Sequence, residues 1–387
     1  MSTVGSILYK IWGKVSNVCL AFRGLSLLSK EETTLALKPF LIHTVPASSL
    51  NLPEVFDEKD PNKKIYEAYT FPSEEIYVWK CGFKKGFISK HGSVVIDSKV
   101  FCTDWDHRGI KHRFWEKDTR PAKSVPTVIP LLSHHQNHQS AIALTGYYDF
   151  VLLLAAKLSR IKDALGEEDV AKCFITYHSF GGAYEREYLE LLGFNPDHYI
   201  DSRTYKLSGE QVIFGNLGTW KPNVNEILSL KRNIENRLNI SNQTPYSGNR
   251  VYISRKGRRV IENEAELIEL LKEFDFTIIE DKGRSVREQI EIYRNASFII
   301  GPHGASFANV IWCRPGTQLY ELFSTSWAPD YFLYMAQINN MKYAAYRDDS
   351  HEEIKNDLFK SLCQDIYVSI PHLRASLAAI LTGGRPE

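Results

Sequence analysis

The sequence has no uninterrupted apolar run of about 18 residues, so a membrane-spanning helix is not expected. Its 6 cysteines are scattered, and none forms a CxxC pair or another metal-ligand spacing. This pattern favours reduced, buried thiols over a disulfide framework. The formal net charge is only +1, so the chain has no global attraction for nucleic acid. Any anion site must therefore be local.

The composition is that of a globular protein, with 43% hydrophobic and 24% charged residues. A chain of 387 residues is too long for one ordinary core, so we expect two domains. We predict an N-terminal amphipathic helix over 1–30, a first Rossmann-like domain over 31–240 and a second over 241–350. The remaining residues, 351–387, are predicted to form a C-terminal helix.

The N-terminal segment mixes apolar residues with Lys10, Lys14 and Arg23. Its apolar stretches are too short for a signal peptide core. A basic amphipathic helix lying on a membrane surface is one interpretation, and a terminal helix packed on its own domain is the other. We therefore expect a cytoplasmic protein with possible peripheral contact to a membrane.

The first half of the chain alternates between predicted loops, strands and helices. Five prolines punctuate residues 31–72, which are predicted to be loop-like. Short β-like runs follow, and they predict a small antiparallel insertion. From residue 127 to residue 240 strands and helices alternate, which predicts a parallel sheet. A cluster rich in Asn, Ser, Gly and Pro over 241–248 marks the expected domain boundary.

The second half is predicted to contain four strands with helices between them. The expected strands are 251–254, 276–279, 297–300 and 318–323. Asn263 is expected to cap one helix, and Ser285 with Glu288 to form a capping box for the next. This β-α-β-α-β order is typical of a nucleotide-binding half.

The turn Gly301-Pro302-His303-Gly304-Ala305-Ser306 follows one of these strands and precedes a predicted helix over 307–313. Ligands bind such sheets where strands end and helices begin. The amides of Gly304, Ala305 and Ser306 would point towards an anion, and His303 would add a donor. The alternative is a tight strand-to-helix turn in which the glycines are needed only for the backbone conformation and bind no ligand.

Two further features come at strand ends of the same predicted sheet. Ser254-Arg255-Lys256-Gly257-Arg258-Arg259 places four cations after one strand, and guanidinium groups match phosphate geometry. Glu321 lies in another strand, where its carboxylate could accept hydrogen bonds from ribose hydroxyls. Because these strands end at one edge of the sheet, the features are predicted to converge on one anion site.

These residues, together with Asn263-Glu264, Asn309 and Arg314-Pro315-Gly316, resemble glycosyltransferase family 61. That family includes plant xylan-decorating transferases and the animal EGF-domain O-GlcNAc transferase. The resemblance is clear over 250–323 and weaker over 146–192. It implies a GT-B fold, in which two Rossmann-like domains face a cleft and the last helix, about 351–381, crosses back to the first domain.

The resemblance also implies the reaction: an inverting, metal-independent transfer from a nucleotide sugar, most simply a UDP-sugar, to a glycan acceptor. It suggests a role in assembling a surface or capsular polysaccharide and requires no cofactor. The donor-binding residues that it implies are Ser254, Arg255, Lys256, Arg259, Gly301, His303, Gly304, Ala305, Ser306, Asn309 and Glu321.

Two residues are predicted to be catalytic: Asp149, as the base in the first domain, and His303 at the anion turn. The run Gly146–Leu153 corresponds to a family motif with an aromatic-His-aromatic order, but here Asp149 replaces the histidine and Leu153 replaces the acid. Asp149 can deprotonate an acceptor hydroxyl or can simply cap its helix. His178, Asp106 and His107 are the other candidates.

A metal site is not expected. His134, His135 and His138 cannot all face one ion from a strand, and no carboxylate or cysteine stands nearby at a ligand spacing. Two other functions remain open: a group transferase of similar architecture, such as a pyruvyl transferase, and a non-catalytic binder of nucleotide sugars or glycans.

Overall fold

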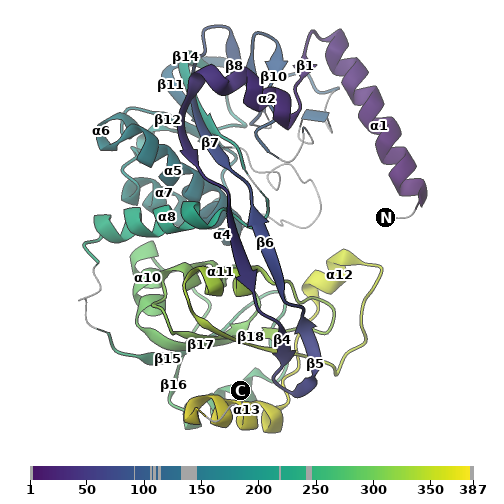
Figure 1. Ribbon diagram of the computed structural model, residues 1–387, viewed down its shortest axis with the longest axis vertical. Helices are drawn as coiled ribbons and strands as arrows, with labels where there is room; N and C mark the ends of the chain where they lie inside the picture. Colours follow the sequence, from purple (N-terminus) through teal and green to yellow (C-terminus); the bar gives the residue numbers. More distant parts are fainter. Residues whose placement is uncertain are drawn as a thin grey trace. The chain divides into compact units, whose positions relative to one another are not determined.

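The computed structural model describes residues 3–90, 92–104, 107, 110–111, 115–131, 146–217, 219–240 and 246–383. The chain divides into two compact units, each of which combines a mainly parallel sheet with helices (Figure 1). The first unit comprises residues 1–48 and 73–241, and the second comprises residues 49–72 and 242–387. The expected α/β class is confirmed.

A six-stranded sheet forms the centre of the first unit, in the order β13-β12-β11-β14-β7-β2. Its strands are β2 (Leu41–Val45), β7 (Ile76–Gly82), β11 (Ala122–Pro130), β12 (Phe174–Tyr177), β13 (Tyr199–Asp201) and β14 (Lys206–Gly215). Strands β13, β12, β11 and β14 are parallel, whereas β7 and β2 run antiparallel to their neighbours.

Helices α5, α7 and α8 lie together on one side of this sheet (Figure 1). The helical segments of the unit, besides α1, are α2 (Lys30–Leu37), η1 (Lys38–Phe40), α4 (Tyr147–Asp149), the π-helical segment η3 (Phe150–Ala155), α5 (Ala156–Leu165), α6 (Glu167–Val170), α7 (Ala183–Leu191), η4 (Pro196–His198) and α8 (Val224–Arg237). The Asn223 side chain caps α8 by accepting a hydrogen bond from the Asn225 amide.

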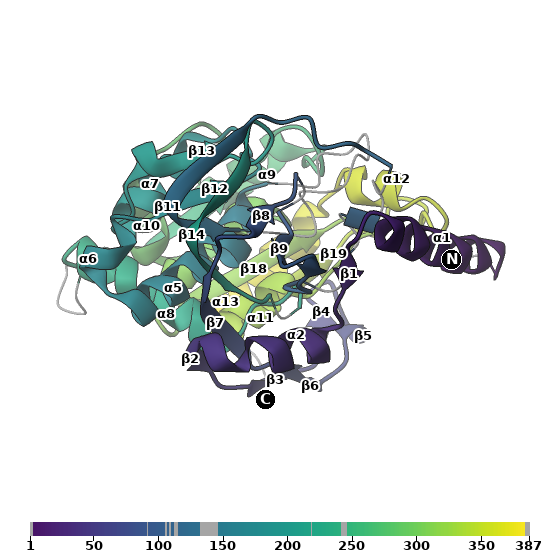
Figure 2. The ribbon, with the colours of Figure 1, turned by 90° about the horizontal axis from the view of Figure 1, so that it is seen from above.

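The N-terminal helix α1 (Thr3–Phe22) reaches outward from the first unit (Figure 2). It adjoins a small sheet of β1 (Ser26–Leu27), β8 (Gly86–Ile88), β9 (Val94–Ile96) and β10 (Lys99–Val100). Leu20 is buried against Val95 and Val100, while Phe22 is 88% exposed. The helix thus packs partly on its own unit, and contact with a membrane stays a prediction. Within the described residues, no helix has the length and apolarity to cross a bilayer.

A seven-stranded sheet forms the second unit, in the order β16-β15-β17-β18-β19-β4-β5. Its strands are β4 (Val55–Asp57), β5 (Asp60–Tyr66), β15 (Asn249–Ile253), β16 (Phe276–Ile279), β17 (Ala296–Pro302), β18 (Gln318–Phe323) and β19 (Lys342–Arg347). All neighbours are parallel except β4 and β5, which form an antiparallel pair.

The predicted loop over 31–72 is wrong, because this segment contains α2, β2, β4, β5 and a separate two-stranded ladder of β3 (Ser48–Leu52) and β6 (Tyr69–Ser73). Its prolines occupy positions that tolerate the missing N–H. Pro61 lies in β5 at the edge of its sheet, and Pro72 lies in β6, which pairs only with β3. Residues 49–72 belong to the second unit, although the first domain was expected to span 31–240.

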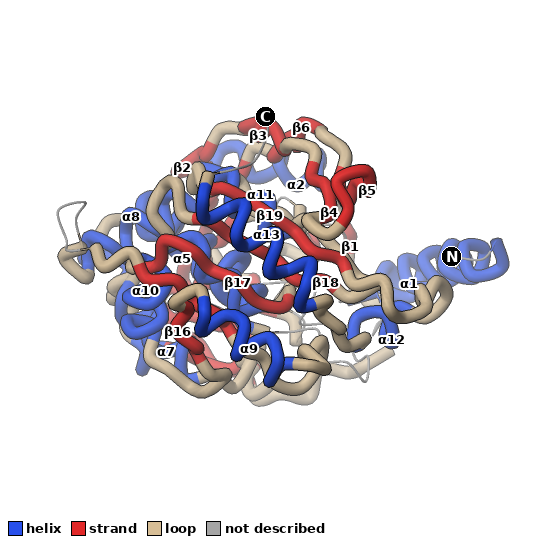
Figure 3. Tube along the Cα trace, turned by 90° about the horizontal axis from the view of Figure 1, so that it is seen from below, coloured by secondary structure: helices blue, strands red, loops and turns tan. Residues whose placement is uncertain are grey.

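Helices cover the seven-stranded sheet, and Figure 3 shows α9 and α13 lying over the same face. The helical segments are α9 (Glu264–Glu273), α10 (Val286–Arg294), the 3₁₀ helix η5 (Ala305–Trp312), α11 (Tyr331–Ile338), α12 (Leu358–Cys363) and α13 (Ile370–Thr382). In α13, Leu373 and Leu377 join Tyr320 and Tyr346 in one buried cluster. The expected single helix that crosses back is therefore wrong, because the apolar side of α13 completes the core of the second unit.

One of the two predicted helix caps in this unit is correct. Ser285 and Glu288 form the capping box of α10. Asn263 precedes α9 but does not cap it, because its side chain bonds both the N–H and the carbonyl of Val368. This residue instead ties the segment before α13 to the start of α9.

Candidate functional site

The predicted anion turn lies at the carboxyl end of β17. His303 and Gly304 follow this strand, and η5 begins at Ala305, so the predicted α-helix over 307–313 is a 3₁₀ helix with an earlier start. The first amides of a helix have no partner within the helix. Those of Ala305 and Ser306, and that of Gly304, make no hydrogen bond to any described residue. They remain available to an anion, as the sequence predicts.

Two arginines from the loop after β15 meet at this turn. Arg259 Nε donates to the His303 carbonyl at 3.0 Å, and Arg255 Nη1 points to the same oxygen at 3.4 Å. A second donor of Arg259, Nη1, bonds the Leu362 carbonyl at 2.8 Å. Neither arginine makes an ion pair with any described carboxylate. The two guanidinium groups are thus held by neutral carbonyls.

Neither arginine forms an ion pair, although Asp281 near Arg255 and Glu321 near Arg259 each raise the pKa of the neighbouring guanidinium slightly. Burial, followed by the nearby Arg255 charge, lowers the pKa of Arg259 to about 9, and burial also lowers the pKa of Arg255. Arg259 therefore stays protonated at neutral pH. An unpaired buried charge is costly, and removing its partner from a pair destabilises by about 3–5 kcal/mol. The site consequently favours a bound anion that supplies the missing negative charge.

Gly304 allows Arg255 to lie against the turn. A Cβ atom at position 304 would be 1.6 Å from Arg255 Nη1. We predict that Gly304→Ala displaces this guanidinium and weakens binding of a nucleotide diphosphate about tenfold, since one charged hydrogen bond contributes about 1.5–3 kcal/mol. Calorimetric titration with UDP would measure the loss. An unchanged affinity would show that Arg255 does not contact the ligand. Gly316→Ala in the same unit, which meets no atom within 4 Å but has a positive φ, controls for general loss of stability.

His303 belongs to a buried hydrogen-bonded chain behind the turn. Its Nδ1 bonds Glu321, whose other oxygen accepts the Tyr343 hydroxyl at 2.7 Å. Phe323 stacks near the imidazole at a centroid distance of 5.3 Å. Glu321 has no exposed surface, so the predicted direct contact of its carboxylate with ribose hydroxyls is wrong. Glu321 instead orients His303.

Electrostatics keep this histidine neutral. Burial, with Arg259 and Arg255 nearby, lowers the pKa of His303 well below its ordinary range. Burial also raises the pKa of Glu321 well above its usual value. Because Nδ1 faces Glu321, the remaining polar ring atom of His303 is Nε2. The side chain can then offer a fixed neutral imidazole nitrogen to a ligand rather than a positive charge.

We predict that Tyr343→Phe lowers the free energy of unfolding by about 1–3 kcal/mol, because Glu321 loses the donor to its second oxygen. Urea titration at neutral pH would measure this change. A matched variant is Tyr367→Phe, since Tyr367 is 41% exposed and its hydroxyl makes no hydrogen bond to any described residue. Equal stabilities of the two variants would contradict a buried role for the Tyr343 hydroxyl.

The other predicted donor residues divide into scaffold and surface positions. Ser254 donates to Glu264 at 2.8 Å, and Asn309 bonds Gln289 and the Ser306 carbonyl while accepting from Trp312. Lys256 is exposed. A Cβ at Gly301 would be 2.7 Å from the Ile253 carbonyl, so this glycine is required by packing of β17 on β15. Arg255, Arg259, His303 and the amides of 304–306 are therefore the groups gathered at the turn.

The candidate base, Asp149, lies in the first unit. Its Oδ2 accepts the Gly146 amide at 3.1 Å, and its Oδ1 has no partner among the described residues. Burial raises the pKa of Asp149 to about 7. The π-helical segment η3 follows directly, and such segments often occur at functional sites. Asp149 thus caps its helix with one oxygen, while its other oxygen is buried without a described hydrogen-bond partner.

The other candidate bases are less suited. His107 Nε2 bonds the Leu28 carbonyl at 2.6 Å, and His178 is half-buried at the end of β12. Asp106 and the histidine cluster at 134–138 lie outside the described residues. Among the candidate bases that the structure describes, Asp149 is thus the buried carboxylate with an unpartnered oxygen.

The corresponding turn of the first unit, between β12 and α7, is already filled. Glu185 accepts hydrogen bonds from the Gly182 amide at 2.7 Å, from the Phe180 amide at 3.3 Å and from the Ser179 hydroxyl. A carboxylate of the chain itself therefore occupies the position that an external anion would take. The turn of the second unit has no such internal carboxylate, which makes it the better anion site.

Comparison with known proteins identifies this part of the chain. Residues 187–320 match the family model of Glycosyltransferase 61. The match confirms the resemblance seen in the sequence and supports a glycosyltransferase. This glycosyltransferase 61 segment includes Arg255, Arg259 and the turn, and it ends one residue before Glu321. Asp149 lies outside it.

A curated relative agrees with this match. The mouse protein O-linked-mannose beta-1,4-N-acetylglucosaminyltransferase 2 is 30% identical over 113 residues. The alignment covers 28% of this chain and only 20% of the mouse protein. The chain therefore corresponds to about a fifth of the length of that relative, so the activity of the whole mouse protein does not transfer directly.

Proposed function

We propose that the chain is an inverting glycosyltransferase of GT-B architecture that takes a nucleotide sugar, with UDP as the favoured nucleotide, and transfers the sugar to a glycan acceptor. The observation that carries this proposal is a pair of arginines, the half-buried Arg255 and the buried Arg259. They meet at a turn with free amides and form no ion pair with a described carboxylate. A diphosphate supplies the negative charge that this arrangement lacks.

In this proposal the site stabilises the leaving group. As the bond between the sugar and the phosphate breaks, negative charge grows on the departing oxygen. Preorganised donors directed at such charge are among the largest contributions to catalysis. Arg255, Arg259 and the amides of 304–306 provide these donors, so the proposed reaction needs no metal ion. His303, held neutral by its surroundings, donates or accepts one hydrogen bond.

The acceptor side of the reaction is assigned to the first unit. Asp149 takes the proton of the attacking hydroxyl, which reaches the anomeric carbon opposite the leaving nucleotide, so the configuration inverts. Support comes from its free oxygen, its burial and its pKa of about 7. A base with a pKa near the working pH is ionised for much of the time and still holds a proton effectively.

A panel of UDP-, GDP-, CMP- and dTDP-sugars tests the proposal. A ligand that binds the folded state raises the melting temperature, and release of free nucleotide from the same sample reports catalysis. We expect UDP-sugars to give the largest shift and slow release of UDP. Stabilisation with no release from any donor would favour a non-catalytic binder. Transfer of label from phosphoenolpyruvate would favour a pyruvyl transferase.

A further inference from the structure

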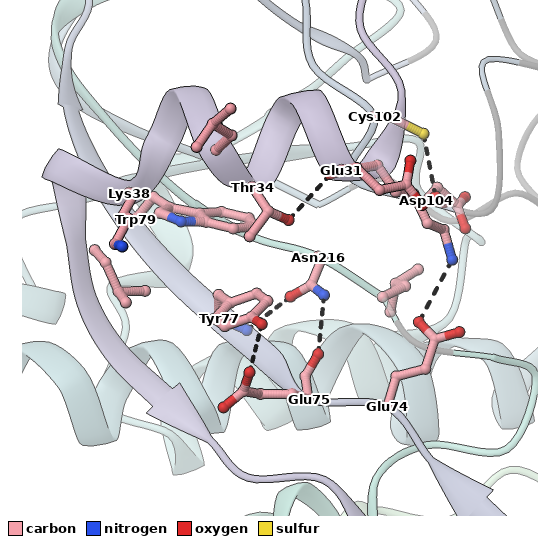
Figure 4. A pocket seen from close by; sticks show the side chains of 14 residues that line it. Glu31, Thr34, Lys38, Glu74, Glu75, Tyr77, Trp79, Cys102, Asp104 and Asn216 are labelled. Carbon is pink, nitrogen blue, oxygen red and sulfur yellow. Dashed lines mark hydrogen bonds and ion pairs between the residues drawn. The ribbon is translucent and has the colours of Figure 1, made fainter.

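The first unit contains a pocket that plays no part in the donor site. It has a volume of about 690 Å³ and lies between helix α2 and strands β2 and β7 (Figure 4). Pockets of roughly 300–1,000 Å³ are the usual size of small-ligand sites. The volume is therefore sufficient for one or two sugar rings.

The pocket has an aromatic and aliphatic side. Tyr77 and Trp79 are neighbours on β7 with ring centroids 5.4 Å apart. Trp79 is 1% exposed and packs against Phe214, so it forms a rigid wall, while Tyr77 is half-buried. Leu35 of α2 lines the opposite side and is 73% exposed. Tyr77, supported by Trp79, can therefore pack against the apolar C–H surface of a pyranose ring, and Leu35 leaves apolar surface for a ligand to cover.

The polar groups of the pocket are held in place. Asn216 accepts the Tyr77 amide at 2.7 Å and donates to the Glu75 carbonyl, as Figure 4 shows. The Tyr77 hydroxyl donates to the Glu75 carboxylate, which fixes the ring. Glu31 is exposed on the opposite side, on α2. Fixed carboxylate oxygens beside an aromatic ring suit the hydroxyl groups of a sugar, which are hydrogen-bond donors.

The charge of the lining restricts the ligand further. Four carboxylates and two amines line the pocket: Glu31, Glu74, Glu75, Asp104, Lys30 and Lys38. Lys30 is already paired with Glu74 at 3.4 Å. Asp104 also interacts with the buried Lys157, so Glu31 and Glu75 against Lys38 leave an excess of one carboxylate, which disfavours uronic acids, phosphates and other anions.

We infer that this pocket binds an uncharged sugar unit of the glycan acceptor, with the Tyr77 ring packed on the sugar and the carboxylates on its hydroxyls. The inference rests on the proposed function, because it assigns the pocket to the acceptor of that reaction. It adds the chemical class of the acceptor, which is a neutral rather than an acidic glycan.

The test uses the full chain and defined oligosaccharides. Saturation-transfer NMR and calorimetry would be run with xylohexaose, maltohexaose and chitohexaose as neutral probes, and with a hexamer of galacturonic acid as the acidic probe. We expect at least one neutral probe to bind and the acidic probe not to bind. Tyr77→Ala is expected to weaken binding about tenfold, because the stacking surface is lost. Glu31→Gln, at an exposed position in the first turn of α2, is expected to weaken binding about threefold.

Glu168→Gln is the matched control, since Glu168 is an exposed carboxylate of the same unit away from the pocket, and it should bind as the parent does. Melting temperatures of all variants would show that each one is folded. Binding of no neutral probe, preference for the acidic probe, or equal binding by the parent, Tyr77→Ala and Glu31→Gln would each overturn the inference. Donor binding and nucleotide release, measured on the same samples, test the proposed function separately. If the variants release nucleotide at the parental rate and bind glycan as the parent does, only the pocket inference is overturned.

Discussion

Replacing Arg255 by methionine lowers the rate of sugar transfer about 10²–10³-fold, the loss typical when one preorganised donor to a developing anion is removed. Methionine keeps much of the length and apolar volume of the side chain but cannot donate a hydrogen bond. Arg255 is the better target of the two arginines, because Arg259 also bonds the Leu362 carbonyl and has a φ of 55°. A change at Arg259 would therefore combine lost catalysis with a disturbed loop.

The measurement is initial-rate kinetics with the donor found in the nucleotide-sugar panel, together with calorimetry for the nucleotide alone. We expect kcat to fall more than donor affinity, because the charge on the leaving oxygen is largest in the transition state. Lys256→Met is the neighbouring comparison: Lys256 is exposed, so solvent screens its charge and the effect should be several-fold at most. Lys272→Met, on the exposed side of α9, controls for a simple change of net charge. Rates of Arg255→Met equal to those of Lys272→Met would refute the diphosphate site.

The main strands of the second unit could be predicted from the sequence because each has a strong local signal. The predicted strands at 276–279 and 318–323 coincide with β16 and β18, and Ser285 with Glu288 marks the start of α10. The convergence of the arginine loop and the turn also follows from the sequence, since parallel strands end at one edge. Local patterns and one topological rule were sufficient for these features.

Features that depend on contacts distant in sequence could not be predicted in this way. Strands β4 and β5 join a sheet whose other strands begin about 190 residues later, and nothing in residues 49–72 indicates that pairing. Tyr343 was missed for a similar reason. Its hydroxyl reaches Glu321 from the neighbouring strand, and a tyrosine in a short strand gives no signal beyond that of a core residue.

Glu321 illustrates the opposite error, in which the position was predicted correctly and the role was not. A glutamate in a strand of a nucleotide-binding sheet suggests a contact with ribose, but burial decides otherwise. With both oxygens used by His303 and Tyr343, this carboxyl group acts on the ligand only through the histidine. The exposed fraction of a side chain depends on the residues packed around it, and the sequence alone does not identify those residues.

Replacing Asp149 by asparagine is expected to reduce sugar transfer about 10²–10⁴-fold, the range for loss of a general base. Asparagine has nearly the same shape, and its amide oxygen can still accept the Gly146 hydrogen bond that caps the helix. The variant therefore removes the basic oxygen while it preserves the cap. If Asp149 served only as a cap, the variant would transfer sugar at nearly the parental rate.

The pH dependence provides an independent check on the same residue. Only the ionised carboxylate can accept a proton, so the parental rate should fall as the pH drops below about 7, by tenfold per unit. Asp149→Asn should lose this dependence. Measurement of kcat/KM between pH 5 and pH 9 with a buffer of constant ionic strength would show both behaviours. A parental profile that is flat across this range would contradict Asp149 as the base.

The raised pKa of Asp149 also predicts that Asp149→Asn is stabilised relative to the parent at high pH, although the variant loses activity. Because the folded-state pKa of Asp149, about 7, lies above its ordinary value of 3.8, the folded protein holds this proton more tightly than the unfolded chain. The resulting stabilisation is fully present below the ordinary pKa and is lost as the pH rises through about 7. Relative to the parent, Asp149→Asn should therefore be more stable at pH 8 than at pH 5, by about 2.6 kcal/mol at most.

Urea titrations of both proteins at the two pH values would measure this difference, and Asp163→Asn is a suitable control because Asp163 is exposed and already paired with Arg232. A variant that gains stability at pH 8 and loses transfer would show that the buried Asp149 carboxylate lowers the stability of the fold but is required for the reaction. A gain in stability with no loss of transfer would agree with the raised pKa of Asp149 but contradict its role as the catalytic base. The two measurements together thus separate a carboxylate that is merely buried from one that takes the proton of the acceptor.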